Sequence, residues 1–298
     1  MDAPTLMAVP NFSEGRERAT LDAIGEALRA GGGARLLDVH ADADHHRSVF
    51  TLAARQGALA DALLSGARAA CERIDVVAPD GAGMPGQHPH VGAVDVVPVV
   101  YLDQSARGAA CADALVVAER IGTELAVPVL LYGELSGGEG ADEPRTRAEL
   151  RRGGVRALAA RLADGSLRAD FGPQRAHPTA GATLVAARPP LVAFNVALAA
   201  PATLAEAQAI SALIREGGAQ GLPGVRAIGV QLGGGVLQVS TNVERPYETP
   251  LATVVEAVAR HRAVASAELV GLAPRAALVG FPADVPLSGF DPARHIIE

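Results

Sequence analysis

The 298-residue sequence contains no lysine, because all 26 of its basic residues are arginine, and it contains no tryptophan. A chain without lysine cannot form a Schiff base with pyridoxal phosphate or a carbonyl substrate, and it cannot build a Walker P-loop. Every fixed cationic contact must therefore come from arginine, whose planar guanidinium group suits carboxylates.

Aromatic residues make up only 3% of the chain, and the net charge is -7. A nucleic-acid surface needs a basic stripe and rings on which bases stack, so this composition argues against nucleic acid as a partner. Apolar residues reach 49% but form no run long enough to cross a bilayer. The first residues also lack the pattern of a secretory signal. We expect a cytoplasmic protein without membrane contact.

The two cysteines, Cys71 and Cys111, lie in alanine-rich segments with helical periodicity. This setting favours two small buried side chains over a disulfide. The sequence has no CxxC pair of the zinc-binding type and no G-x-S-x-G nucleophile motif, and its glycine runs lack the spacing of a dinucleotide fingerprint. Nothing here supports a serine or cysteine hydrolase.

The order of predicted elements occurs twice, which indicates an α+β chain with two subdomains over 1–174 and 180–298. The elements β-α-β-β-α-β in each half are those of an α/β plait. A further helix, a strand and an arginine-rich helix around 144–162 enlarge the first subdomain, and the segment 170–179 is expected to be the linker. The first copy comprises 6–10, a helix after Ser13, 35–40, 47–54, 57–74 and 93–101, and the second comprises 191–198, a helix capped by Thr203 and Glu206, 225–232, 236–242, a helix from 250, and 267–272.

The most informative segment is Pro-Gly-Gln-His-Pro-His-Val-Gly-Ala-Val-Asp over 85–95, which sets His88 and His90 in a Gly/Pro loop before an apolar strand. A second motif, Val-Pro-Asn-Phe-Ser-Glu-Gly, occupies 9–15. Together they resemble the formiminotransferase family, whose members transfer a formimino group from N-formiminoglutamate to tetrahydrofolate. Family sequences open with VPNFSEG and carry the catalytic histidine in a loop of the form G-E-H-P-R-M-G-A-x-D-V. The resemblance covers nearly the whole chain and implies two subdomains with substrate in the cleft between them.

The family's catalytic histidine falls on His88, which we predict to be the general base. An imidazole titrates near neutral pH, so it can take a proton and return it. The alternative is a histidine that only orders its turn. Asp95 follows on the next strand, where it either orients the histidine loop or serves as an ordinary strand residue.

The resemblance also assigns binding of substrate or folate to a set of polar side chains in both halves. Asparagine and glutamine offer a donor and an acceptor together, as the edge of a pterin requires, but they equally suit turns and cross-strand hydrogen bonds. Tyr132 either stacks on the pterin ring or completes a core strand. The set consists of Asn11, Arg47, Tyr132, Gly133, Arg188, Asn195, Gln238 and Asn242.

Several departures from the family pattern bear on the identity of the donor. Two imidazoles replace an acidic and an amide side chain in 38–47, Gln87 stands for a glutamate, His90 for an arginine, and Pro189 follows Arg188 where basic residues usually continue. Two alternatives therefore remain open. One is a transferase of the same fold with another one-carbon donor, such as N-formylglutamate, and the other is a noncatalytic relative that binds folate or another metabolite.

A metal site is the remaining alternative. If the segment 40–46 stayed extended, His40, Asp42, Asp44 and His46 would point to one side and could bind zinc. The same residues are also good turn formers, and we expect no metal. The resemblance implies tetrahydrofolate as co-substrate and a homodimer. The chain is also too short to include the cyclodeaminase to which some family members are fused.

Overall fold

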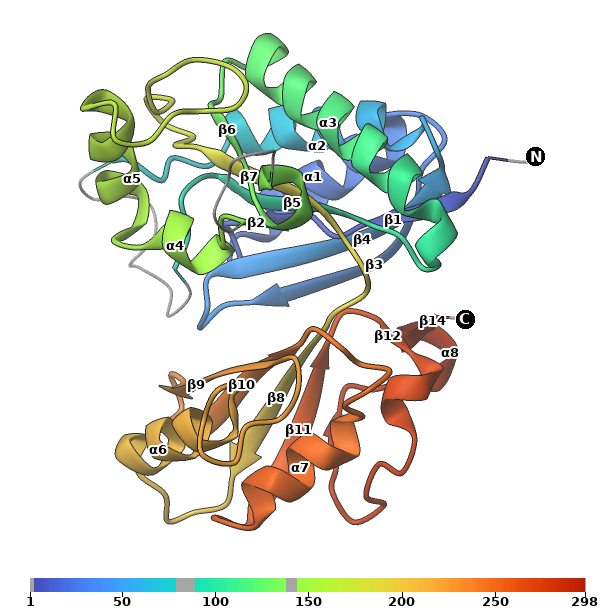
Figure 1. Cartoon of the computed structure of the whole chain (residues 1–298), viewed down its shortest axis with the longest axis vertical. Coiled ribbons are helices and arrows are strands. Elements are labelled where there is room, and N and C mark those ends of the chain that lie inside the picture. Colours follow the sequence, from blue (N-terminus) through green and yellow to red (C-terminus); the bar gives the residue numbers. More distant parts are fainter. Residues whose placement is uncertain (1–2, 79–88, 138–143, 298) are drawn as a thin grey trace. The chain divides into compact units, whose positions relative to one another are not determined.

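The computed structural model describes residues 3–78, 89–137 and 144–297, and it divides the chain into two compact units, Met1–Pro189 and Pro190–Glu298. Each unit combines one large β-sheet with helices (Figure 1). This confirms the predicted α+β class. The division falls between two adjacent prolines, later in the chain than the linker expected around 170–179.

The first unit contains a seven-stranded sheet. Its opening strand is interrupted at Val9 and Pro10, so that β1 and β2 both lie between β4 and β5. β3 pairs with β4 at one edge, while β7 and β6 continue the sheet beyond β5 in parallel. The strands are β1 (Thr5–Ala8), β2 (Asn11–Phe12), β3 (Arg35–Asp42), β4 (Arg47–Arg55), β5 (Val94–Val100), β6 (Val129–Leu131) and β7 (Thr183–Arg188).

Three helices cover one face of this sheet: α1 (Arg18–Ala30), α2 (Leu59–Cys71) and α3 (Arg107–Glu124) (Figure 1). Apolar side chains spaced three and four residues apart give each helix a buried stripe. In α1 these are Leu21, Ile24 and Leu28, which pack with residues such as Phe50 and Leu52 of β4. Residues of β4 between these positions point to the opposite face of the sheet.

The arginine-rich helix predicted over 144–162 is in fact two helices, α4 (Arg147–Arg151) and α5 (Gly154–Ala163). Gly153 and Gly154 break it because both adopt positive φ angles, 78° and 68°, which glycine tolerates best. Leu150 and Leu158 then pack against β5, β6 and β7 from the side opposite α3. The same cluster contains Val96, Leu130, Tyr132, Leu162, Ala182, Leu184 and Ala186.

The strand β7 was not predicted, and it moves the subdomain boundary. Residues 180–189 belong to the first unit, because β7 pairs with both β5 and β6. The preceding segment is also tied to this unit, since Phe171 and Val129 form an isolated bridge. The predicted start of the second subdomain at residue 180 therefore lies about ten residues early.

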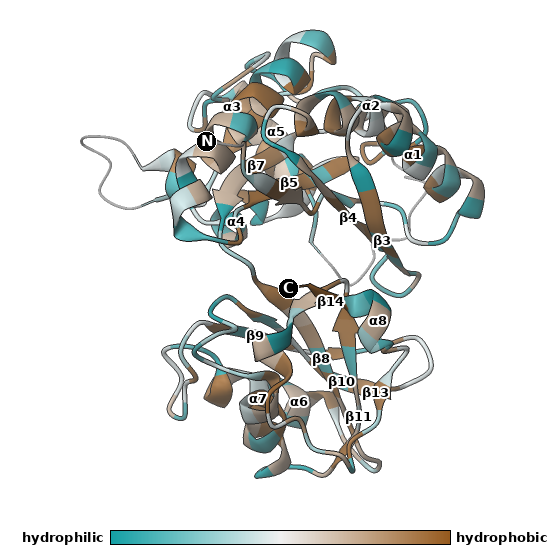
Figure 2. Cartoon of the chain, turned by 90° about the vertical axis from the view of Figure 1, so that its right-hand side faces the viewer, coloured by the Kyte–Doolittle hydropathy of each residue, from teal (hydrophilic) through white to brown (hydrophobic). Residues whose placement is uncertain are grey.

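The second unit has a five-stranded sheet in the order β13-β11-β8-β10-β9, in which β8 to β11 are antiparallel and β13 adds in parallel. Its helices α6 and α7 cover one face, and β8 and β11 are largely brown in the hydropathy colouring of Figure 2. The predicted capping box of Thr203 and Glu206 is present at the start of α6. The elements are β8 (Val192–Leu198), α6 (Leu204–Ile214), β9 (Val225–Gln231), β10 (Leu237–Val243), α7 (Leu251–Ala259), β11 (Val264–Val270) and β13 (Leu287–Ser288).

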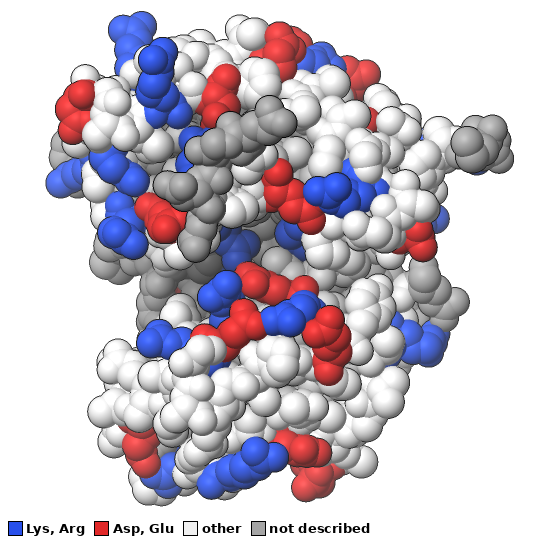
Figure 3. Space-filling view, viewed as in Figure 1, with Lys and Arg blue, Asp and Glu red and all other residues white. Residues whose placement is uncertain are grey.

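Short elements complete the fold. They are the 3-10 turns Gln104–Ala106, Gly133–Ser136 and Arg275–Leu278, the helix α8 (Pro292–His295), and the paired strands β12 (Ala273–Pro274) and β14 (Ile296–Ile297). Both cysteines are free and half-buried. Figure 3 shows arginine and acidic side chains interspersed on the visible surface of each unit. None of the helices in the described ranges combines the length and apolarity that a bilayer crossing needs.

Candidate active site

The two sequence motifs meet in the first sheet. β2, from the opening motif, pairs with β5, the strand that follows the histidine loop. Ser13 fixes the contact, because its backbone N–H donates to the carbonyl of Ala93 at 3.0 Å and its hydroxyl donates to the carbonyl of Gly92 at 2.7 Å. The opening motif therefore anchors the C-terminal end of the histidine loop.

Two glycines make this approach possible. A Cβ atom on Gly92 would overlap the carbonyl oxygen of Ala182, and a Cβ atom on Gly15 would overlap that of Asp42. Gly15 thereby brings the opening motif against the turn between β3 and β4. Gly15 and Gly92 are therefore needed for close backbone approach.

The predicted catalytic residue His88 and its neighbour Gln87 lie outside the described residues. The described part of the loop begins at Pro89 and continues through His90, which is half-buried. The backbone N–H of Val91 donates to Oδ1 of Asp95 at 2.9 Å. Asp95 thus holds the end of the histidine loop, the position predicted for an orienting residue.

Asp95 also forms a buried ion pair that the sequence did not reveal. Arg151, the last residue of α4, donates from Nη2 to Oδ2 of Asp95, and its Nε lies 3.4 Å from Oδ1. The exposed fractions are 2% for Asp95 and 7% for Arg151. Asn11 pairs with Val96 and Phe12 with Val94, so Asp95 is the extra residue of a β-bulge. Such a bulge re-aims a side chain, here toward α4.

Arg47 begins β4 and lies on the same face of the sheet, next to Arg151 and Asp95. Burial lowers its pKa to about 10, and repulsion by Arg151 contributes. Its Nε is buried and has no hydrogen-bond partner among the described residues. We call the surface formed by Asn11, Arg47 and Asp95, together with Arg147 and Arg151 of α4, the arginine face. In it the amide of Asn11 donates to the carbonyl of Val9 at 2.9 Å.

The turn between β3 and β4 separates the four residues considered for a metal. The strand ends at Asp42, whose Oδ2 lies 2.5 Å from Nδ1 of His45. His46 adopts a φ of 49° and lies 3.4 Å from Glu14 instead. The extended arrangement that a zinc site required is therefore not formed. The described ranges contain no group of three or more potential ligands that could hold a metal ion.

Asp42 is strongly acidic in this turn. Burial alone would raise its pKa, but hydrogen bonds from the side chain and backbone of His45, with the attraction of that imidazole, outweigh it and lower the pKa to about 2. The backbone N–H of Asp44 also donates to Asp42. Asp42 therefore stays ionised and stabilises the turn that presents Arg47.

The other predicted residues of the first unit lie at the ends of parallel strands. Tyr132 follows β6, and its hydroxyl is buried without a partner in the described part of the chain. Gly133 adopts a φ of 58° and its N–H donates to the carbonyl of Arg145 at 2.9 Å. Arg188 ends β7 and donates to the carbonyl of Pro189 at 2.9 Å.

In the second unit, the predicted residues share the sheet face opposite α6 and α7. Asn195 is central: its amide donates to Glu268 at 3.0 Å, and its oxygen accepts from Ser240 at 2.8 Å. Gln238 is 4% exposed, and its Nε2 has no partner among the described residues. Asn242 is four residues after Gln238 in β10, so its side chain points to the same face of the sheet. We call the surface formed by Asn195, Gln238, Ser240 and Asn242 the amide face.

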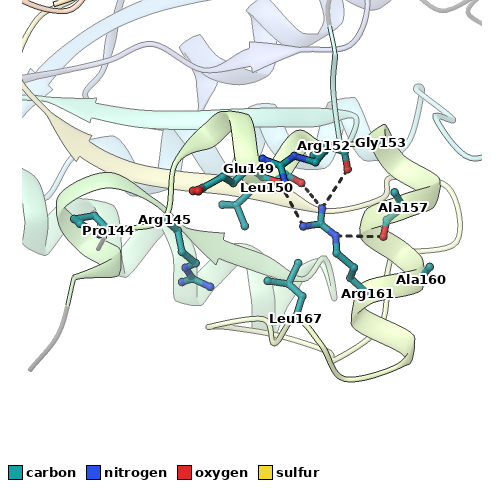
Figure 4. Close-up of a pocket in the computed structure, with 10 residues that line it drawn as sticks. All are labelled: Pro144, Arg145, Glu149, Leu150, Arg152, Gly153, Ala157, Ala160, Arg161 and Leu167. Carbon is teal, nitrogen blue, oxygen red and sulfur yellow. Dashed lines mark hydrogen bonds between the residues drawn. The ribbon is translucent and has the colours of Figure 1, made fainter. Parts of the chain in front are cut away.

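A pocket of about 750 Å³ lies elsewhere in the first unit, between α4 and α5 (Figure 4). Arg161 crosses it and donates to the carbonyls of Leu150 at 2.6 Å and of Glu149 and Ala157 at 3.4 Å each. Its guanidinium is thus occupied in holding the two helices together. The described side chains that line the pocket include none of the predicted site residues.

Four residues of this arrangement were not predicted: Arg147, Arg151, Ser240 and Glu268. Arg147 and Arg151 stand four apart, a spacing that places two side chains on one side of a helix. Ser240 stands between Gln238 and Asn242 in the alternation of one strand. These spacings were the available signals, whereas the pairing of Glu268 with Asn195 depends on tertiary structure.

Fold and site define an α+β protein in which each unit packs helices on one face of its sheet and places polar side chains on the other, which in the first unit is also partly covered by α4 and α5. The model of the formiminotransferase domain, N-terminal subdomain, matches residues 5–188. The chain belongs to the formiminotransferase family.

Three relatives show the extent of the similarity. A glutamate formimidoyltransferase of Streptococcus pyogenes is 33% identical and covers 99% of this chain and 98% of the relative. One of Thermoplasma acidophilum is 32% identical, with coverages of 95% and 93%. A formimidoyltransferase-cyclodeaminase of Sus scrofa is 37% identical over 91% of this chain, which spans 50% of that relative.

Proposed function

We propose that this chain is a glutamate formiminotransferase, an enzyme that transfers the formimino group of N-formiminoglutamate to N5 of tetrahydrofolate. The observation that carries the proposal is the similarity to glutamate formimidoyltransferases along almost the full length of both chains. A one-carbon transfer of this kind serves histidine catabolism and folate-dependent metabolism.

The chemistry needs one group that moves a proton twice. N5 of tetrahydrofolate attacks the amidine carbon, and a base accepts the N5 proton as a tetrahedral intermediate forms. When the bond from carbon to the glutamate nitrogen breaks, the same group returns the proton to the leaving amine. We assign this role to His88 from the family motif. The assignment is supported by the anchoring of the loop end through Ser13 and Asp95.

We further propose that the substrates bind to the polar side chains predicted from the sequence. Among these, Arg47, Tyr132 and Gln238 each carry a buried polar atom without a hydrogen-bond partner among the described residues. An unpaired buried donor costs free energy, roughly 1–3 kcal/mol, unless a ligand satisfies it. This supports binding roles for them and, by proximity or family motif, for Asn11, Gly133, Arg188, Asn195 and Asn242.

The finer features of the prediction belong to the same proposal. In the second unit the strand order β11-β8-β10-β9 supports an α/β plait. In the first unit, β5, the opening strand, β4 and β3 stand in the corresponding order, which supports a plait enlarged by β7 and β6. A homodimer follows from the family resemblance, and sedimentation of the purified chain checks it.

An absorbance assay for 5-formiminotetrahydrofolate tests the function directly. The purified chain is incubated with tetrahydrofolate and either N-formiminoglutamate or N-formylglutamate. Turnover with N-formiminoglutamate alone supports the proposal. Turnover with N-formylglutamate alone shows a transferase that uses a different donor. Calorimetric binding of both ligands without product identifies a noncatalytic relative. The proposal requires no metal ion, so a chelator must leave the rate unchanged.

A further inference from the structure

The charges of the arginine face do not balance within the described residues. The nearby carboxylates already have partners: Asp95 forms an ion pair with Arg151, and Asp42 pairs with His45. Arg47 forms no ion pair with an acid in the described ranges, although both of these acids attract it. Buried or half-buried cations are normally paired, so this end of the sheet has an excess of positive charge that a ligand can neutralise.

Arg147 adds to this excess. It stands four residues before Arg151 in α4, and side chains at this spacing lie on the same side of a helix. Since Arg151 reaches from that side to Asp95, Arg147 also flanks the arginine face. It is near enough to Arg47 to contribute to the lowering of its pKa. Arg147 is half-buried and forms no ion pair with an acid in the described ranges.

Arg47 and Arg147 are two guanidinium groups without an acidic partner in the described part of the chain, and together they match a ligand with two carboxylates. A guanidinium group binds a carboxylate through two parallel hydrogen bonds. Arg151 is not available for such a contact, because it already pairs with Asp95. We infer that Arg47 and Arg147 bind the two carboxylates of a glutamyl group. The inference rests on the proposed function, and it adds Arg147 to the site. Both substrates carry such a group, N-formiminoglutamate in its body and tetrahydrofolate in its tail.

Binding of an unreactive probe tests the site without turnover. Titration calorimetry compares N-acetylglutamate with N-acetylalanine, which lacks the second carboxylate, on the wild-type chain and on Arg147→Gln. Charge-assisted hydrogen bonds predict a loss of about tenfold or more in N-acetylglutamate affinity for Arg147→Gln, with little change for N-acetylalanine. Arg152→Gln is the matched control, because it removes the same charge from the pocket side of α4 (Figure 4).

Steady-state kinetics then identify which substrate supplies the glutamyl group. If the donor does, Arg147→Gln raises KM for N-formiminoglutamate about tenfold and leaves KM for tetrahydrofolate unchanged. If the folate tail does, wild type prefers tetrahydrofolate to tetrahydropteroate, which lacks the tail, and Arg147→Gln abolishes the preference. In both cases kcat changes little, since the contact exists before and during the reaction.

The outcomes separate this inference from the proposed function. If N-acetylglutamate binding depends on Arg147 but the chain shows no turnover, the dicarboxylate site is supported and the transferase function is contradicted. Turnover with the same KM values in wild type, Arg147→Gln and Arg152→Gln overturns the site and keeps the transferase. Equal losses in Arg147→Gln and Arg152→Gln also overturn it, because a general charge effect then explains the result. Absence of probe binding to wild type, with unchanged KM values, has the same meaning.

Discussion

The arginine face and the amide face differ in how they satisfy polar groups. On the arginine face, charge is dominant: Asp95 and Arg151 neutralise each other, while Arg47 retains a buried donor without a partner among the described residues. On the amide face, neutral side chains form a row that ends at a carboxylate beside the face: Ser240 donates to Asn195, and Asn195 donates to Glu268. The first arrangement suits charged ligand groups, and the second suits a neutral ring with donors and acceptors. The contrast predicts that the two faces respond differently to mutation, salt and pH.

The largest effect is expected at His88, the proposed general base. His88→Ala should lower kcat by about 10²–10⁴-fold, the usual worth of a positioned general base. His90→Arg is the control, because the family loop carries arginine at that position, and it should keep most of the activity. Rates of both variants are measured by formation of 5-formiminotetrahydrofolate. A His88→Ala enzyme with near-normal kcat would remove the assignment.

The buried ion pair of the arginine face should dominate its stability. Arg151→Met leaves Asp95 buried without its cation, which costs about 3–5 kcal/mol. Arg145→Met breaks a pair with Asp170 whose side chains are 30% and 29% exposed, and such pairs contribute about 0–1 kcal/mol. Urea denaturation followed by circular dichroism compares the two variants. Equal midpoints would show that Asp95 is not dependent on Arg151.

Asp95 and Arg151 also show how much of the site the sequence alone could predict. The strand after the histidine loop and the aspartate on it were predictable, because an apolar run that follows a Gly/Pro segment is a local pattern. Arg151 was not, since it lies 56 positions from Asp95 and only the packing of α4 brings them together. For the same reason β7 was missed: its parallel pairing with β5 and β6 leaves no local signature.

The second unit was easier to predict than the first. Its hairpin of β9 and β10 and the capping box at Thr203 and Glu206 depend on neighbours in sequence, and the structure contains both. The split between α4 and α5 was visible only as two adjacent glycines within an otherwise helical pattern. In the site, Gln238 and Asn242 came from the family resemblance, and the structure places them two positions on either side of Ser240 in β10. The tertiary contact between Asn195 and Glu268 had no sequence signal.

The turn that presents Arg47 should make stability depend on acid. A carboxyl group with a lowered folded pKa stabilises the fold above its ordinary pKa of 3.8, and this contribution is lost as pH falls toward about 2. Asp42→Asn should therefore cost about 1–2 kcal/mol at pH 7 and little near pH 2. Asp44→Asn, at an exposed neighbouring position, is the matched control. Thermal unfolding between pH 2 and pH 7 measures the difference, and a loss that does not vary with pH would contradict it.

The smallest effect is expected on the amide face, where its direction is the most informative feature. Gln238→Met keeps a similar volume but removes a buried donor that has no partner among the described residues. If Nε2 is held for the folate, the variant should be as stable as wild type or more so, because an unpaired donor has been removed. At the same time KM for tetrahydrofolate should rise about 2–10-fold, the worth of one neutral hydrogen bond. This rise should be insensitive to salt, unlike that of Arg147→Gln.

Gln208→Ala on the opposite, helical side of the unit serves as control. A Gln238→Met enzyme that loses stability while keeping its KM would make Gln238 a structural residue and end the contrast between the two faces.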